Sequence, residues 1–168
     1  MATEKVLGCF AIKEVHWLTP NVLYVLFLTS DSFVGMRFRS ALRALDVVRQ
    51  FGPVSVTEDR IVVDRLTHLV QGLTRTKENE SGLLSGERNW ELDWSSIASA
   101  DKRNFRLPYA EIRMVGMKRS SIGPSTQRSG KVVVLTYSRR LQYDIVFSQR
   151  FDDCVYLLSA LLKDKVKA

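Results

Sequence analysis

Hydrophobic and polar residues alternate along the first part of the chain, a pattern typical of β-strands. A first, loosely alternating run contains Phe10, Ile12, Val15 and Trp17, and a turn cluster (TPN) ends it at residues 19–21. From residue 6 to residue 38 we therefore expect three strands joined by two turns.

The second of these strands has a different pattern from the first. Residues 22–29 (VLYVLFLT) are rich in β-branched and aromatic residues and are apolar on both faces, which predicts a central strand buried on both sides. A third run at residues 33–38 contains Gly35, and a glycine inside a strand indicates a bulge or a close approach of the backbone.

At Ser40 the hydrophobic period changes from two to about 3.6, which predicts helices. The first helix has an apolar face that begins at Ala41 and ends at Phe51, before Gly52-Pro53. A second helix is expected over residues 55–73, where Ser55 and Glu58 match a capping box. Its apolar stripe consists of Val62, Leu66, Leu69 and Leu73.

The next segment is poor in hydrophobic residues. Residues 74–88 combine glycines, serines and charged residues, and this composition predicts a loop. Trp90, Trp94 and Ile97 then recur at helical spacing, so a short third helix ending near Ala100 is expected. Residues 40–100 together form a predicted helical block.

From residue 102 the period returns to two. Strands are expected at residues 104–107 and 111–118, with Ile112 and Met114 on one side of the second strand. Residues 120–130 have the composition of a loop. A hairpin follows, with strands at residues 131–137 and 141–147 around a turn at 138–140.

The chain ends with a predicted amphipathic helix over residues 149–163. Asp152 and Asp153 suit its positive N-terminal end, and Lys163 suits its C-terminal end. The predicted buried stripe consists of Phe151, Val155, Leu158 and Leu162.

Two stretches resemble the pleckstrin-homology-like (PH-like) superfamily, including its GRAM-type and bacterial members. The first is the strand–turn–strand segment NVLYVLFLTSDSFVGMRF. The second is the hairpin of residues 131–147 with the closing helix, preceded by a characteristic spacing of Asp101, Asn104, Phe105, Pro108, Tyr109 and Ile112. The resemblance covers residues 6–38 and 101–163.

This resemblance implies an α+β fold in one domain spanning residues 1–168. Seven antiparallel strands, drawn from residues 6–38 and 103–148, would form a bent, partly closed barrel that the C-terminal helix of residues 149–163 caps. The helical block of residues 40–100 would be an insertion between the third and fourth strands. The family also implies binding of lipid head groups, peptides or proteins, and no enzymatic activity.

The chain departs from the phosphoinositide-binding members of that family at one loop. Residues 14–21 (EVHWLTPN) contain no lysine or arginine, whereas the corresponding loop of those members is basic. Recognition of a head group of that kind is therefore not expected.

Positive charge is concentrated in one segment. The chain has 25 Lys+Arg, 18 Asp+Glu and a net charge of +7. Residues 102–140 hold the whole excess, and such a field attracts phosphates, anionic lipid or acidic proteins. The alternative is a solvated face that only maintains solubility. The predicted anion-binding residues are Lys102, Arg103, Lys118, Arg119, Arg128, Lys131, Arg139 and Arg140.

No residue pattern predicts catalysis, a metal site or a cofactor. His16 and His68 have no second ligand at metal spacing, and Cys9 and Cys154 are typical of small core residues. No apolar run is long enough to span a bilayer, and no signal peptide is present, so a cytoplasmic location is expected.

The sequence therefore favours a non-enzymatic binding or scaffolding module whose basic edge meets an acidic protein or anionic lipid. Trp90 and Trp94 either pack in the core or form a surface for a partner. The alternative function is nucleic-acid binding through residues 102–140, with Phe105, Tyr109 and Tyr137 as stacking candidates.

Overall fold

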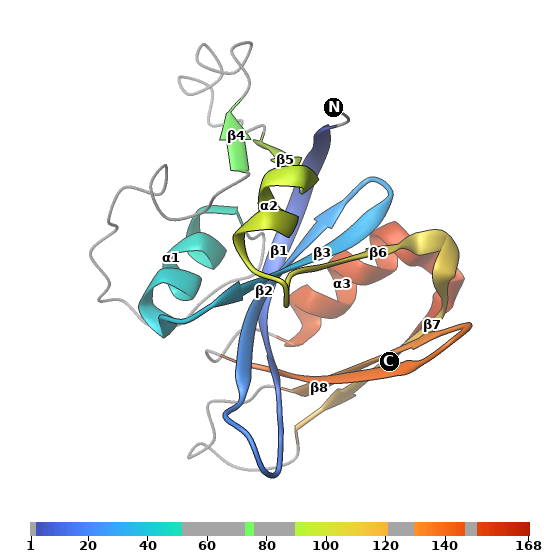
Figure 1. Cartoon of the computed structure of the whole chain (residues 1–168). Coiled ribbons are helices and arrows are strands. Elements are labelled where there is room, and N and C mark those ends of the chain that lie inside the picture. Colours follow the sequence, from blue (N-terminus) through green and yellow to red (C-terminus); the bar gives the residue numbers. More distant parts are fainter. Residues whose placement is uncertain (1–2, 52–72, 76–89, 121–129, 147–150) are drawn as a thin grey trace.

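The computed structural model has an α+β fold with a mostly antiparallel, unclosed sheet (Figure 1). It describes residues 3–51, 73–75, 90–120, 130–146 and 151–168. Within these residues the sheet contains ten strands, and the main path through it runs β10-β7-β8-β9-β1-β2-β3-β6. None of the helices in this described part is long and apolar enough to cross a membrane.

The first half of the sheet is the predicted meander. It comprises β1 (Thr3–Glu14), β2 (Val22–Thr29) and β3 (Ser32–Phe38), and β6 (Phe105–Pro108) pairs with the outer edge of β3. The predicted bounds of the second strand are confirmed. The first strand ends at Glu14, so the expectation that Val15 and Trp17 continue it is wrong.

The second half begins after the 3-10 turn η4 (Tyr109–Glu111). It consists of β7 (Ile112–Arg119), β8 (Gly130–Thr136) and β9 (Arg140–Ile145), and the two-residue strand β10 (Val166–Lys167) runs parallel to β7. Antiparallel pairing of β9 with β1, including Ile145 opposite Ile12, joins the two halves.

A register shift in β7 changes which residues face the interior. The shift lies between Ile112 and Met114, at Arg113. Beyond it Val115 and Met117 are buried, whereas Met114 is only half-buried. The prediction that Ile112 and Met114 share a face is therefore wrong, because the extra residue of a bulge reverses the alternation.

The segment between β3 and β6 contains both helices and strands. Helix α1 (Ala41–Phe51) matches the prediction, and β4 (Leu73–Arg75) pairs with β5 (Trp90–Asp93), which in turn pairs with β1. Apart from residues 73–75, the helix predicted at 55–73 and the loop predicted at 74–88 lie outside the described residues. At 73–75 the chain is strand.

The third predicted helix begins later than expected. Helix α2 spans Trp94–Ala100, and Asp93 caps it by accepting a hydrogen bond from the backbone N–H of Ser95 (3.1 Å). Trp90 instead belongs to β5, so its helical assignment is wrong. Pairing with β4 and β1 holds residues 90–93 in extended conformation up to the cap.

The first sheet half separates two hydrophobic cores, which explains the apolar character of both faces of β2. Helix α3 (Phe151–Leu162) covers one face, and we call this side the α3 core. Helices α1 and α2 lie on the other side of β1–β3, around what we call the α1 core (Figure 1). Tyr24 and Leu26 point into the α3 core, while Val25 and Phe27 point into the α1 core.

The C-terminal helix is confirmed over Phe151–Leu162, and residues 149–150 of its predicted span lie outside the described residues. Phe151, Leu158 and Leu162 of the predicted stripe are buried, and Val155 is partly buried against the α3 core. The chain then passes through the 3-10 turn η5 (Lys163–Lys165) into β10.

Gly35 permits a close approach between neighbouring strands, as its position in a strand predicts. It lies opposite Phe105 of β6, and the aromatic ring occupies the space that a side chain at residue 35 would need. The ring also meets Tyr24 edge to face, with ring centroids 5.4 Å apart. Phe105 therefore fixes β6 against the meander.

A buried carboxylate ties the start of β1 to the turn between β2 and β3. Glu4 Oε2 accepts hydrogen bonds from the hydroxyls of Thr29 and Ser32, both at 2.6 Å, and its other oxygen pairs with Arg106 of β6. Burial favours the neutral acid, but the two hydroxyls and the Arg106 charge outweigh it and lower the pKa of Glu4. One carboxylate thus connects three segments of the sheet.

Candidate functional site

Two of the predicted anion-binding residues lie directly opposite each other in the sheet. Lys118 near the end of β7 faces Lys131 near the start of β8. On the next strand Asp144 lies opposite Lys131, and on the strand after that Lys13 lies opposite Asp144. Side chains that are paired in this way share one face of the sheet, so residues from β7, β8, β9 and β1 form a single row.

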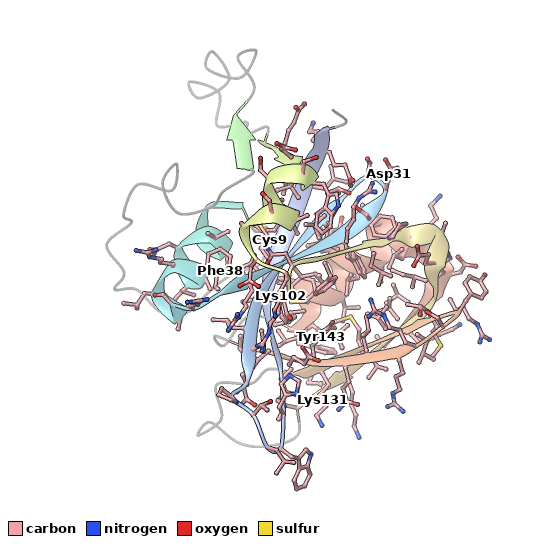
Figure 2. The ribbon with its side chains drawn as sticks, in the orientation of Figure 1. Cys9, Asp31, Phe38, Lys102, Lys131 and Tyr143 are labelled. Atoms are coloured by element: carbon pink, nitrogen blue, oxygen red, sulfur yellow. The ribbon has the colours of Figure 1, made fainter. Side chains whose placement is uncertain are left out.

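We call the three cations Lys13, Lys118 and Lys131 the lysine row. Adjacent strands are about 4.8 Å apart, so the row spans about 14 Å. Lys118 is exposed, Lys13 and Lys131 are half-buried, and Asp144 between them is 9 % exposed. Figure 2 labels Lys131, which lies beside the lower part of the β1–β2 hairpin.

The lysine row carries a formal charge of +3, or +2 when Asp144, which lies between Lys13 and Lys131, is counted. The ion pairs His16–Glu14, Arg37–Asp101, Arg106–Glu4 and Arg119–Asp152 involve none of these lysines. Like charges directly opposite each other are destabilising. Placing Lys118 against Lys131 therefore costs stability, and an anion between them would relieve this repulsion.

Arg119 makes contacts within the protein instead. Its guanidinium pairs with Asp152 in the first turn of α3 and lies 5.0 Å from the centroid of the Phe151 ring. These contacts connect the end of β7 to the start of the closing helix. Arg106 is likewise engaged with Glu4.

Arg139 and Arg140 lie at the opposite end of the hairpin from the lysine row. Arg140 is opposite Leu135, which is four residues along β8 from Lys131, a distance of about 13 Å. Both arginines are exposed. The strand register therefore separates Arg139 and Arg140 from Lys118 and Lys131, so the predicted anion-binding residues do not form one cluster.

The remaining predicted cations are dispersed. Lys102 and Arg103 are exposed in the turn between α2 and β6, where the backbone N–H of Arg103 donates to Asp101 Oδ1 (2.9 Å). Asp101 also pairs with Arg37 at 3.2 Å. Arg128 lies outside the described residues.

The two tryptophans predicted as a partner surface occupy different elements. Trp94 is the first residue of α2, and its half-buried side chain packs against the α1 core. Trp90 is the first residue of β5, where the backbone pairs with Arg75 of β4.

The aromatic residues considered for stacking on nucleic-acid bases are mostly engaged inside the protein. Phe105 packs on Gly35, and the Tyr109 hydroxyl donates to the backbone oxygen of Thr29 (2.8 Å). Burial raises the pKa of Tyr109 above its ordinary value. Tyr137 is 77 % exposed, and the Arg113 guanidinium lies 5.9 Å from its ring centroid.

The cysteines are poorly suited to nucleophilic chemistry. Cys9 and Cys154 are both fully buried. Burial raises the pKa of the Cys154 thiol to about 12 and that of Cys9 further. Because the thiolate is the reactive form, these thiols are inert core residues at neutral pH. Among the described residues no group of three or more His, Cys, Asp or Glu could hold a metal ion.

The loop between β1 and β2 is a feature that the sequence pattern did not reveal. Trp17 is 100 % exposed and Leu18 is 99 % exposed. The pair lies only a few residues beyond Lys13, at the end of the sheet that carries the lysine row. A usable signal was the loss of alternation after residue 14, where four residues (VHWL) precede the turn cluster.

No family model matches this chain, and no curated protein and no solved structure matches it.

Proposed function

We propose that this protein is a non-enzymatic binding module with a PH-like barrel, which presents the lysine row to an acidic protein surface or to anionic lipid. The observation that carries the proposal is the alignment of Lys13, Lys118 and Lys131 from separate strands in one row, which outnumber the single carboxylate, Asp144, between them. Such an arrangement raises the local concentration of anions.

Two features support the PH-like part of this proposal. The strands β6, β3, β2, β1, β9, β8 and β7 are successive antiparallel neighbours, which is the arrangement that a partly closed seven-stranded barrel requires. Helix α3 packs on the inner side of this sheet, as a capping helix would.

The surroundings of the cysteines, of Glu4 and of His16 support a non-enzymatic function. The two thiols are buried and protonated, and Glu4 is fully engaged by Thr29, Ser32 and Arg106. The only histidine among the described residues, His16, is exposed beside Glu14 at 3.6 Å. None of these groups has the paired acid and base that catalysis needs.

Binding of a polyanion panel tests this function. The panel comprises phosphatidylserine vesicles, poly-glutamate, single-stranded RNA and duplex DNA, each measured at several salt concentrations. The variant Lys118→Gln/Lys131→Gln should weaken binding by about tenfold or more, since each lysine near an anionic surface contributes about 1 kcal/mol. Its salt dependence should also decrease, because fewer counterions are released.

The variant Arg139→Gln/Arg140→Gln is the matched control, because it removes the same charge from the opposite end of the hairpin. It should bind nearly as well as the wild type. The proposed function is wrong if the wild type binds neither the vesicles nor poly-glutamate, and binding of RNA or DNA alone would favour the alternative, nucleic-acid binding. The assigned surface is wrong if the arginine variant is the weaker of the two.

A further inference from the structure

The tip of the β1–β2 loop is an exposed apolar protrusion. Trp17 and Leu18 have almost no contact with the rest of the protein, and Val15 is 51 % exposed. Other large apolar side chains at the surface, such as Tyr137 and Tyr156, stay partly covered. Adjacent large apolar side chains in full contact with water are unfavourable, and they indicate an interaction site.

The base of this loop is well defined. The last strand pair is Glu14 opposite Val22. The backbone N–H of His16 donates to Asn21 Oδ1 (3.0 Å), and His16 Nε2 lies 3.6 Å from Glu14 Oε2. These contacts hold the two sides of the loop together. The hairpin extends beyond the neighbouring strands at the lower end of Figure 1.

The apolar tip and the lysine row occupy the same end of the sheet. Lys13 precedes the loop in β1, and its row continues through Asp144 to Lys131 and Lys118. A surface that meets the tip is therefore close to these lysines, whereas Arg139 and Arg140 are at the far end of the hairpin. Apolar and cationic groups can thus engage one partner together.

We propose that this end of the protein docks on an anionic membrane, with Trp17 and Leu18 inserted at the interface and the lysine row against lipid phosphates. The inference rests on the proposed function and specifies its partner. A bilayer interface accepts a convex apolar tip without a matching pocket, and indole rings favour that region. Long lysine side chains extend to phosphates beside it.

The composition of the loop supports insertion. Residues 15–21 (VHWLTPN) contain no lysine, arginine, aspartate or glutamate, so the tip enters the interface without burying a permanently charged group. The positive charge lies behind the tip, at the level where headgroup phosphates would be. Reversible membrane binding commonly needs two such signals, one apolar and one electrostatic.

The observations favour a membrane over the other anionic partners. An RNA base could stack on Trp17 but would leave Leu18 in water, and an acidic protein would need a pocket complementary to both side chains. Those two classes of partner are outcomes of the test below.

The test measures binding of the full chain to phosphatidylcholine vesicles, with and without about one third phosphatidylserine. The wild type should bind the anionic vesicles only. Trp17→Ala/Leu18→Ala should bind them at least about tenfold more weakly. It should keep the salt dependence of the wild type, because its lysines remain. Tyr156→Ala, which truncates an exposed aromatic residue of α3, is the matched control and should change binding less than twofold.

Insertion itself is detected with lipids brominated on the acyl chains, which quench nearby tryptophan. Quenching should be stronger for the wild type than for Trp17→Ala, in which Trp90 and Trp94 are the remaining tryptophans, so the difference between the two proteins reports the insertion of Trp17. Circular dichroism of each variant checks folding, and both substituted side chains are solvent-exposed.

Several outcomes would overturn the insertion proposal and leave the proposed function standing. One is binding to poly-glutamate without binding to vesicles. Another is unchanged vesicle binding by Trp17→Ala/Leu18→Ala when Lys118→Gln/Lys131→Gln binds weakly. A third is an equal loss of poly-glutamate binding in the tip variant, which would assign the tip to a protein partner. Absence of binding to every anionic probe would overturn both proposals.

Discussion

Leu158→Ala should lower the free energy of unfolding by about 2–5 kcal/mol, because it removes a fully buried side chain and leaves a cavity. Leu158 lies in the middle of α3 and belongs to the α3 core, which also contains residues of both sheet halves. Denaturant unfolding at equilibrium measures the loss. The result depends on α3 being docked, so it tests how the two halves are held together.

The matched control for this prediction is Tyr156→Ala on the same helix. Tyr156 is 78 % exposed, so its truncation should change the unfolding free energy by less than about 0.5 kcal/mol. If Leu158→Ala also costs less than this, α3 does not pack against the sheet as described.

Gly130→Ala should destabilise the protein by about 1–3 kcal/mol through overpacking. A Cβ atom at residue 130 would lie 2.6 Å from the Phe151 ring and 2.7 Å from the backbone oxygen of Lys118. The ring is buried in the α3 core, and the oxygen belongs to the paired strand β7, so neither can move freely. Thermal unfolding followed by circular dichroism measures the effect.

Gly116→Ala is the corresponding control in β7. A Cβ atom there would have its nearest neighbour at 3.9 Å, which is ordinary van der Waals contact. This substitution should be neutral or slightly stabilising, because alanine restricts the unfolded chain. Equal effects of the two substitutions would contradict the tight contact of α3 with the start of β8.

Local patterns in the sequence predict much of the strand and helix content. The exact bounds of β2 follow from its run of β-branched and aromatic residues, and α1 follows from its 3.6-residue period. The double-sided apolar character of β2 correctly indicates burial on both faces, one toward α3 and one toward α1. These features depend on nearest neighbours along the chain, which is why the sequence reveals them.

Features set by pairing between distant segments were predicted less well. Trp90 has helical spacing with Trp94, but its backbone is extended because β4 and β1 supply hydrogen-bonding partners. The bulge at Arg113 reverses the buried face of β7, and only the register with β8 reveals it. Tertiary context overrides local periodicity in both cases.

The candidate site was predicted only in part, for the same physical reason. Composition identifies residues 102–140 as basic, but strand register decides which cations meet. Lys118 and Lys131 come together, Arg139 and Arg140 are separated from them, and Lys13 joins the row from outside the basic segment. Trp17 is exposed because β1 ends at Glu14, whereas the alternating pattern predicts that the strand continues to Trp17.

Amide hydrogen–deuterium exchange of the full chain, with and without phosphatidylserine-containing vesicles, tests the central claim most directly. The account predicts that bound vesicles slow exchange at residues 13–18 and at the β7 and β8 ends around Lys118 and Lys131, with little change at residues 137–141. Slowed exchange concentrated at residues 137–141 or 102–106 would contradict it, because the anionic partner would then occupy a different surface.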